Sequence, residues 1–367
     1  MENEPSEKKP LFTIIEDSQE QQAKIKVVGV GGGGSSAINH MITKGLTGVE
    51  FIVMNTDAQA LRSSKADIRL QLGINITKGL GAGANPEIGY QSALESIDEI
   101  RNSLTGADVV FIAVGMGGGT GTGASPVVAE IAKELGALTI GVVSKPSFFE
   151  GNKRINYANK GITQLSLHID SLLTIPNDQL KKVLPKGISF MDALAATNDV
   201  LYDAVSGFIS IINDENGVIN IDFADVKTIM SEVGTTAMMG TGISSGIENA
   251  HDRANEATQK ALNCPLLEDI EISNARGVMG HITSGSTFTL DEYEIVGDML
   301  KEIASPDARI ILGVTIDHTL EQFNLNVTVI LTGIGELLPD CTEASSPKKE
   351  VMKHNKLMKL NYLFQRN

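Results

Sequence analysis

The feature that most constrains this chain is a glycine–threonine run at 117–123 (GGGTGTG), between an apolar stretch at 108–114 and a helical stretch at 124–135. Glycine adopts positive φ and lets backbone N–H groups approach a ligand closely. The helix start adds unpaired amides and the positive end of its dipole, which suit a phosphate. A flexible surface loop is the alternative, but alternating threonines supply hydroxyls that suit phosphate oxygens. The run therefore predicts a phosphate-binding turn between a strand and a helix.

Composition limits the class of protein. The 367 residues suffice for two domains, and no apolar run approaches the roughly 20 residues of a membrane helix. The N-terminus lacks the basic start and apolar core of a signal peptide, so we expect a cytoplasmic protein without a transmembrane segment. The net charge of −15 argues against nucleic acid as a partner, because phosphate backbones would repel this body. Residues 348–367 carry a net charge of +5, so this tail is expected to contact a partner or an anionic membrane.

Short apolar stretches alternate with amphipathic ones from residue 25 onward, which is typical of βαβ units around a parallel sheet. The expected strands of the first half are 25–30, 49–54, 108–114, 137–143 and 171–175. The expected helices there are 36–44, 88–103, 124–135 and 155–168, followed by a long apolar helix at 188–212. A second α/β unit is expected from helices at 223–232, 250–262 and 290–304 and strands at 277–283, 310–316 and 326–332.

These patterns predict an α/β protein with five segments. Residues 1–24 are polar without any period and are expected to be disordered. A Rossmann-like parallel-sheet domain at 25–190 is joined by a long central helix and connection at 191–219 to a smaller α/β domain at 220–335. Residues 336–367 are expected to form a flexible linker and basic tail. Function in such a sheet lies at the carboxyl ends of its strands.

A second glycine-rich turn, 29–36 (GVGGGGSS), follows the first expected strand. It contains the dinucleotide fingerprint Gly-x-Gly-x-x-Gly, and Asp57 after the next strand could hold a ribose hydroxyl. One pyrophosphate needs one such loop, however, so two glycine-rich turns favour a mononucleotide triphosphate held from two sides. No Gly-x4-Gly-Lys-Ser/Thr sequence occurs, so amides and hydroxyls would hold the phosphates and a metal ion would supply positive charge. The two cysteines and six histidines lack ligand spacing, so no metal site made directly of protein side chains is expected.

Three further segments leave a structural and a functional interpretation open. The cluster at 79–86 (GLGAGANP) is either a mobile loop or a cover over a phosphate tail. Glu150 and Arg154 suit a ribose hydroxyl and a phosphate or base, but their spacing favours an ordinary ion pair along a helix. Asp222 and Asp225 suit a helix cap and a first-turn acid, and they could also orient a water for attack on a phosphate. From spacing alone, capping is the leading interpretation.

Taken together, these motifs resemble the tubulin/FtsZ family of GTPases. The run at 117–123 matches the GGGTGTG motif of that family, which is more specific than any Gly-x-Gly-x-x-Gly pattern. Further segments that resemble the family, in the same order, are 26–34, 49–60, 77–89 and 220–230. The resemblance covers about residues 25–335 and so both expected domains.

The resemblance implies a GTP-binding domain and a C-terminal GTPase-activating domain, with GTP or GDP as ligand and Mg²⁺ bound through the phosphates. It implies a homopolymer, assembled head-to-tail into protofilaments, that forms the division ring at mid-cell on the inner face of the membrane. Asp222 and Asp225 would then enter the nucleotide site of the next subunit and act in hydrolysis. Positions implied to contact the nucleotide are Gly32, Gly33, Gly34, Ser35, Ser36, Gly119, Thr120, Gly121, Glu150, Arg154 and Asn198.

Within that set, the resemblance assigns Glu150 and Arg154 to the ribose and base side and Asn198 to guanine recognition. The chain also departs from the family. Ser35 and Ser36 stand where Gly-Asn is usual, and Leu194 stands where a phenylalanine is expected to pack on guanine. The loss of that stacking would cost on the order of 1 kcal/mol in binding. The resemblance implies membrane-anchoring division proteins as partners of the C-terminal tail, although this tail has little likeness to the acidic, proline-containing end that docks them in the family.

Three functions follow, in decreasing order of support. The first is a self-assembling GTPase of the division ring, and the second is a nucleotide-binding filament protein that hydrolyses poorly. GTP turnover that rises with protein concentration would separate these two. The third is a dinucleotide-dependent oxidoreductase that uses the turn at 29–36, although no residue offers a hydride-transfer acid or base.

Overall fold

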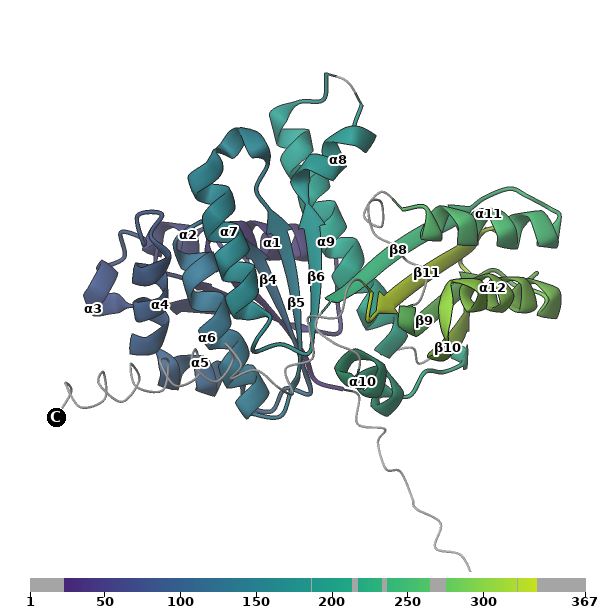
Figure 1. Ribbon diagram of the computed structural model, residues 1–367, viewed down its shortest axis with the longest axis horizontal. Helices are drawn as coiled ribbons and strands as arrows, with labels where there is room; N and C mark the ends of the chain where they lie inside the picture. Colours follow the sequence, from purple (N-terminus) through teal and green to yellow (C-terminus); the bar gives the residue numbers. More distant parts are fainter. Residues whose placement is uncertain are drawn as a thin grey trace, which may run out of the picture.

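The computed structural model describes residues 23–185, 187–212, 217–232, 236–264, 275–321 and 323–334. Within these residues, eleven strands form one continuous sheet (Figure 1). The strands are β1 (Ile25–Val30), β2 (Glu50–Asn55), β3 (Ile68–Gln71), β4 (Val109–Gly115), β5 (Leu138–Lys145), β6 (Ser171–Pro176), β7 (Gly217–Ile219), β8 (Thr236–Ser244), β9 (Ala275–Ser284), β10 (Ala304–Ile316) and β11 (Leu325–Thr332).

Helices connect most of these strands, as the alternating pattern predicts. The helices are α1 (Gly31–Thr43), α2 (Ala58–Arg62), α3 (Ile74–Thr77), α4 (Pro86–Glu95), α5 (Ile97–Leu104), α6 (Thr120–Glu134), α7 (Asn152–Leu165), α8 (Asn177–Val183), α9 (Phe190–Ile212), α10 (Phe223–Glu232), α11 (Ala250–Leu262) and α12 (Leu290–Ile303). A short 3-10 turn, Phe148–Glu150, precedes α7.

The strands lie in the order β3-β2-β1-β4-β5-β6-β8-β11-β9-β10-β7. From β3 to β8 all neighbours run parallel, as predicted for the first unit. β11 is antiparallel to β8 and β9, and β7 is antiparallel to β10, so the second unit is mixed. The chain order reverses between β1 and β4, and open α/β sheets bind ligands at the carboxyl ends of strands beside such a switch point.

The sheet is narrowly paired where its two units meet. Among the described residues, only Leu172 and Leu173 of β6 pair with β8, whereas β8 pairs with β11 from Ala237 to Ser244. Helix α9 lies beside this junction, between the two units (Figure 1). Its 23 residues span about 34 Å, which confirms the long helix expected at 188–212.

A shared apolar core covers the same junction. Phe208 of α9 packs on Phe111 of β4, with ring centroids 5.6 Å apart. The buried cluster that contains both residues also includes Val226 of α10 and Ile330 of β11. Removal of this apolar surface from water holds both units on α9.

Several helices differ from the prediction. The short helices α2, α3 and α8 were not predicted, and α6 and α7 begin a few residues earlier than expected. α1 begins at Gly31 and not at Ser36, and two glycines of this early start, Gly33 and Gly34, pack against β4. The single helix expected at 88–103 is two helices, α4 and α5, which meet at Ser96. The Ser96 hydroxyl accepts a hydrogen bond from the Gly73 amide at 3.2 Å. A serine that binds a neighbouring loop in this way favours a helix end over a helix interior.

Strand β8 was not expected, because glycines interrupt its apolar pattern. A Cβ at Gly242 would collide with the carbonyl oxygen of Ala257 in α11. Glycine therefore allows α11 to lie directly on the strand. Met238 and Met239 of this strand are buried, with exposures of 7% and 4%. The short edge strands β3 and β7 were also not predicted.

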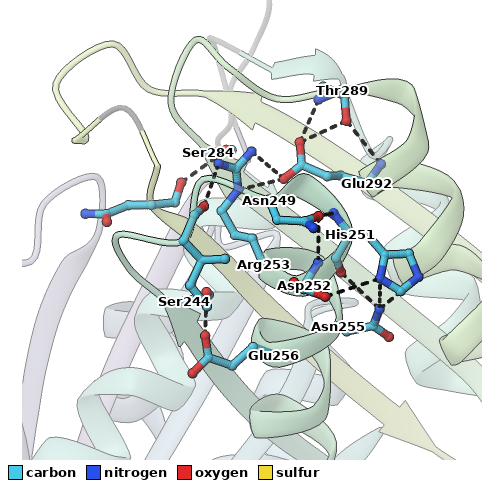
Figure 2. A network of polar contacts seen from close by, with 12 residues as sticks. Ser244, Asn249, His251, Asp252, Arg253, Asn255, Glu256, Ser284, Thr289 and Glu292 are labelled. Atoms are coloured by element: carbon cyan, nitrogen blue, oxygen red, sulfur yellow. Dashed lines mark hydrogen bonds and ion pairs between the residues drawn. The ribbon is translucent and has the colours of Figure 1, made fainter.

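A buried ion pair joins α11 to α12 in the second unit (Figure 2). Arg253 and Glu292 are 1% and 0% exposed, and Oε1 of Glu292 lies 2.6 Å from Nη2 and 2.7 Å from Nε of Arg253. Arg253 Nη1 also donates to the Ile247 carbonyl at 3.2 Å. The other oxygen of Glu292 accepts hydrogen bonds from the amide and hydroxyl of Thr289, which completes a capping box at the start of α12.

The expected linker and basic tail at 336–367, and nearly all of the segment 1–24, lie outside the described residues. Their assignments stay predictions, as do the domain boundaries at 190 and 219. No helix among the described residues is long and apolar enough to cross a membrane.

Candidate functional site

Two glycine turns touch at the switch point of the sheet. β1 continues directly into α1, and β4 leads through the glycine–threonine run into α6. A Cβ at Gly31 would lie 2.7 Å from the amide nitrogen of Gly121, so the turns meet through bare backbone. A Cβ at Gly32 or at Gly118 would meet nothing within 4 Å. These two glycines therefore border open space at the edge where a ligand is expected.

The next two glycines of α1 face the sheet. A Cβ at Gly33 would lie 2.8 Å from the Cα of Gly115, and one at Gly34 would collide with the carbonyl oxygen of Ala113. Both positions thus need glycine so that α1 can approach β4. Any contact of Gly33 or Gly34 with a ligand would come from the backbone N–H groups of the first helical turn.

Helices α1, α6 and α7 begin without a side-chain cap and without an acidic residue in the first turn. They follow β1, β4 and β5, so their N-termini gather at one edge of the sheet. Unpaired amides and the positive ends of helix dipoles attract an anion. In contrast, α2 is capped by Asp57, whose Oδ1 accepts hydrogen bonds from the amides of Gln59 and Ala60. The dinucleotide interpretation required that carboxylate for a ribose.

The threonine hydroxyls of the run bind the protein itself. Thr120 Oγ1 lies 2.7 Å from Thr56 Oγ1 in a buried hydrogen bond. Thr122 Oγ1 accepts a hydrogen bond from the Gly117 amide at 2.9 Å. These hydrogen bonds fix the shape of the turn, and the backbone amide of Thr120 is one group that a nucleotide could use.

The third glycine cluster, 79–86, packs against the glycine–threonine run. A Cβ at Gly119 would lie 2.8 Å from the amide nitrogen of Asn85 and 2.9 Å from the Cβ of Ala82. Leu80 at the tip of the cluster is 86% exposed. Of the two interpretations that the sequence left open, this position favours a cover beside the phosphate-binding turn.

Glu150 and Arg154 form the ion pair that their spacing predicts, with Oε2 and Nη1 2.9 Å apart. Glu150 Oε1 also accepts a hydrogen bond from the Ser147 amide at 2.8 Å. Arg154 lies beside the glycine–threonine run, because a Cβ at Gly117 would be 2.6 Å from its Cγ. The pair therefore borders the candidate site, and its contacts with a nucleotide stay a prediction.

Ser36 and Asn198 meet across 162 positions of sequence. The Asn198 Nδ2 group on α9 donates to the Ser36 hydroxyl on α1 at 3.2 Å. Leu194 lies one turn before Asn198 on α9 and is 47% exposed. Ser35 differs from its neighbour, because its side chain is buried and its hydroxyl donates to the Gly31 carbonyl at 2.8 Å. Only Ser36 of the two serines presents its side chain toward the central helix.

One polar residue at this edge was not predicted. Asn177 begins α8 directly after β6, and its Oδ1 is buried without a hydrogen-bond donor among the described residues. A buried carbonyl oxygen left unpaired costs about 1–3 kcal/mol, so a donor from a ligand would stabilise it. The sequence signal was a polar residue immediately after an apolar strand, which is common in α/β proteins.

Asp222 and Asp225 are exposed at the start of α10. Oδ1 of Asp222 accepts a hydrogen bond from the Ala224 amide at 3.1 Å, which confirms the predicted cap. Neither carboxylate has any neighbour from the glycine turns among the described contacts.

Helix α10 is fixed at the amino ends of the central strands, opposite the glycine turns. Lys227 Nζ lies 3.5 Å from the Gly136 carbonyl oxygen before β5, and the Ser171 hydroxyl at the start of β6 donates to the Met230 carbonyl at 3.0 Å. Figure 1 shows α10 and α8 at opposite ends of these strands. The eight residues of β5 span about 26 Å, so the acids cannot reach the turns of their own chain.

Two family models match this chain. The model described as "Tubulin/FtsZ family, GTPase domain" matches residues 24–185, and "FtsZ family, C-terminal domain" matches residues 235–335. The chain belongs to the tubulin/FtsZ family. Its predicted α/β fold class and its resemblance to this family are both confirmed.

Relatives of this FtsZ-family chain are similar to it in sequence over most of its length. Cell division protein FtsZ of Buchnera aphidicola subsp. Schizaphis graminum is 53% identical over 353 residues, which cover 96% of this chain and 90% of that protein. Cell division protein FtsZ of Wigglesworthia glossinidia brevipalpis is 54% identical over 325 residues, covering 89% and 82%. A solved structure titled "FtsZ dimer, empty (M. jannaschii)" has a TM-score of 0.78 at 40% identity and covers 89% of this chain and 96% of its own.

The family assigns the candidate site to a class of chemistry. A GTPase domain of the tubulin/FtsZ type supports GTP or GDP as the ligand and GTP hydrolysis as the reaction, within cell division. This favours a mononucleotide held from two sides, as the two glycine turns predict. The oxidoreductase hypothesis is without support in this FtsZ-family chain.

Proposed function

We propose that this chain binds GTP at its two glycine turns and hydrolyses it only where a second subunit supplies Asp222 and Asp225. The observation that carries the proposal is the separation of these acids from the turns by the length of the central strands. One subunit holds the phosphates at one end and the acids at the other. Head-to-tail stacking would join the two half-sites, so hydrolysis would depend on assembly into protofilaments.

The phosphates would be held mainly by backbone amides. The first turns of α1 and α6 offer unpaired N–H groups beside Gly32 and Gly118, where the chain leaves open space. Arg154, a cation beside this edge, is paired with Glu150. Amide donors alone leave most of a triphosphate charge uncompensated, so Mg²⁺ bound through the phosphates fits this site and would supply the positive charge.

The nucleoside would lie between α1, α7 and the start of α9. Asn198 is proposed to read guanine, and the Glu150–Arg154 pair to contact the ribose and base side. Asn177 adds a buried carbonyl oxygen that a guanine or ribose donor would satisfy. The exposed Leu194 would contact the base without aromatic stacking, so we expect weaker GTP binding than phenylalanine would give.

Asp222 and Asp225 would orient the attacking water in the site of the neighbouring subunit. Phosphoryl transfer depends largely on positioning and electrostatics, so two carboxylates at a fixed helix start suit this role. A relative at 40% identity has been solved as an FtsZ dimer, which supports association between copies. The polymer would act in the cytoplasm as the division ring at mid-cell, with the tail at 336–367 contacting a membrane-anchoring partner or the membrane.

The first test is GTP hydrolysis measured against protein concentration with magnesium present, together with light scattering. Turnover per subunit that rises beyond a threshold, in step with scattering, is the expected result. Scattering without turnover would support a filament protein with an impaired site. GTP binding with neither signal would overturn the assembly mechanism.

Asp225→Ala tests the shared site directly. Turnover in the assembled protein should fall at least about 100-fold, whereas GTP affinity of the dilute, unassembled subunit should change less than twofold. Asp291→Ala, which removes an acid from the first turn of α12, is the matched control. Loss of GTP binding in the Asp225 variant would contradict a two-subunit site, and lower stability with normal turnover would leave only a role at the helix start.

A further inference from the structure

A polar stripe on α1 faces the central helix. Ser36, His40 and Lys44 recur every four residues and therefore lie along one side of α1. Ser36 contacts Asn198, and the other two contact Asp199. Both nitrogen atoms, Nε2 of His40 and Nζ of Lys44, lie 2.8 Å from the same Asp199 oxygen, Oδ1.

This three-residue contact, His40–Asp199–Lys44, is called the α1–α9 clamp below. The Lys44 ammonium also lies 5.7 Å from the ring centroid of Tyr202, one turn further along α9. Asp203 follows on the same side, where burial and the charge of Asp199 raise its pKa. The hydrogen bonds and charges of Lys44 and His40 lower the pKa of Asp199 in spite of its burial, so the clamp holds an ionised carboxylate.

The clamp is adjacent to the residue proposed to recognise guanine. Asn198 uses Nδ2 for Ser36, which leaves Oδ1 as an acceptor. Guanine presents N–H donors at N1 and N2, so an acceptor at a fixed position distinguishes it from bases without them. The Ser36 contact alone is a single neutral hydrogen bond, worth about 1 kcal/mol. Two charge-assisted bonds to the neighbouring Asp199 add the restraint that it lacks.

We infer that Asp199, held by His40 and Lys44, is a positioning residue that fixes Asn198 against α1 and thereby sets the preference of the site for guanine. The inference rests on the proposed function, because it assumes that Asn198 reads the base. The α1–α9 clamp fixes how far α9 lies along α1, and α1 carries the phosphate-binding turn at its start. Helix α1 therefore positions both the phosphate-binding turn and, through α9, the residue proposed to contact the base.

The test compares affinities for GTP and for ITP, which lacks the N2 donor, on the full chain below its assembly concentration. Asp199→Asn should weaken GTP binding about tenfold and narrow the GTP-over-ITP ratio about threefold. Asp203→Asn makes the same charge change one turn later on α9 and should alter neither value more than twofold. His40→Gln keeps a hydrogen-bond donor. Its GTP affinity and its ratio of GTP to ITP affinity should therefore lie between those of the wild type and of Asp199→Asn.

A double-mutant cycle with Asn198→Ala shows whether Asp199 acts through Asn198. Asp199→Asn should cause no further loss of GTP affinity, and no further narrowing of the ratio, once Asn198 is alanine. Equal losses in both backgrounds, or a lower melting temperature with an unchanged ratio, would overturn the inference alone. If Asn198→Ala itself left the GTP-over-ITP ratio unchanged, the proposed base recognition would fail, and the positioning role with it.

Discussion

The helices at the glycine turns and the helices of the second unit begin in opposite ways. α1 and α6 start without a side-chain cap or a first-turn acid. α11 starts at Asn249, which accepts hydrogen bonds from the first amides, and α12 starts at the capping box of Thr289 and Glu292. A capped start is satisfied by the chain, whereas an uncapped start keeps its amides for an anion. The contrast separates the part of the fold that serves a ligand from the part that serves stability.

The second unit depends on its own buried charges, and their removal gives the largest expected effect. Arg253→Met would leave the fully buried carboxylate of Glu292 without its cation (Figure 2). The free energy of unfolding should fall by about 3–5 kcal/mol in urea titrations. Excess GTP should raise the free energy of unfolding of the variant and of the wild type by the same amount, because the ion pair lies far from the glycine turns.

The double variant Arg253→Met with Glu292→Met is the control for this prediction. With neither charge buried, most of the loss should be recovered, except for about 1 kcal/mol from the missing capping box. A double variant as unstable as the single one would show that the two helices are held by shape and not by the balance of charge.

An acidic residue placed at the uncapped start of α6 should increase the stability of the nucleotide-free protein and decrease its GTP affinity. Gly118→Asp points its side chain into open space near the first turn of α6. The nucleotide-free protein should become more stable by about 0.5 kcal/mol, because a carboxylate favours a helix N-terminus. GTP affinity should fall at least about 100-fold, or about 2.7 kcal/mol, through repulsion of the phosphates. Gly118→Asn has nearly the same shape without the charge, and equal losses in both variants would contradict the electrostatic explanation.

Two glycines of the same helix should respond differently to one methyl group. A Cβ at Gly34 would collide with the Ala113 carbonyl, so Gly34→Ala should destabilise the protein by about 1–3 kcal/mol. A Cβ at Gly32 meets nothing, so Gly32→Ala should leave the thermal midpoint nearly unchanged and reduce GTP affinity instead. Differential scanning calorimetry and nucleotide titration measure the two effects. Equal destabilisation by both variants would mean that Gly32 does not border a ligand.

The smallest expected effects concern two aspartates of α9, the helix between the contrasted regions. Burial would raise the pKa of Asp199, but the hydrogen bonds and charges of Lys44 and His40 outweigh it and lower the pKa. Ionised Asp199 therefore stabilises the fold at any pH above the ordinary pKa of an aspartate. That stability is lost as the pH falls through the lowered pKa. Asp203 has a pKa raised by burial and by Asp199, so its ionised form destabilises the fold at neutral pH. The penalty at Asp203 disappears as the pH falls below its raised pKa.

Asp199→Asn should therefore lower the thermal midpoint at about pH 7.5, and Asp203→Asn should raise it, each by less than about 1 kcal/mol in stability. The Asp203→Asn difference should shrink as the pH falls through the raised pKa of Asp203, and the Asp199→Asn difference only below the ordinary aspartate value, as the pH falls toward the lowered pKa of Asp199. Midpoints measured across this range provide the check. A destabilised Asp203→Asn protein at neutral pH would show that this carboxylate is needed as a charge.

The sequence predicted the repeating elements better than it predicted close packing. Period and turn residues located α10 and α11 to the residue, because amphipathic helices need no glycine to fold. Strand β8 was missed because glycine at positions such as Gly242 serves a neighbouring helix, which local sequence does not reveal. The early start of α1 was missed for the same reason, since glycine usually predicts a turn.

For the candidate site, the sequence motifs located the glycine turns, but they did not show which residue of a turn borders the ligand and which one packs against the protein. Gly32 and Gly34 are the same residue type in the same motif, yet Gly32 borders open space and Gly34 packs on β4. Asn177 carried no motif, and its unpaired oxygen appears only once β6 and α8 are folded. The residues Ser36 and Asn198 were each predicted through the family resemblance, and their direct contact required the structure.

The two residue pairs that join β6 to β8 have a mechanical meaning. A sheet transmits bending and twisting loads through its ladder of hydrogen bonds, and the load per bond is greatest where the ladder is shortest. At Leu172 and Leu173 that ladder is backed by the apolar surface of α9, which resists separation but permits sliding. Torque applied to the second unit would therefore be taken up as rotation about α9, while each half of the sheet moves as a stiff plate.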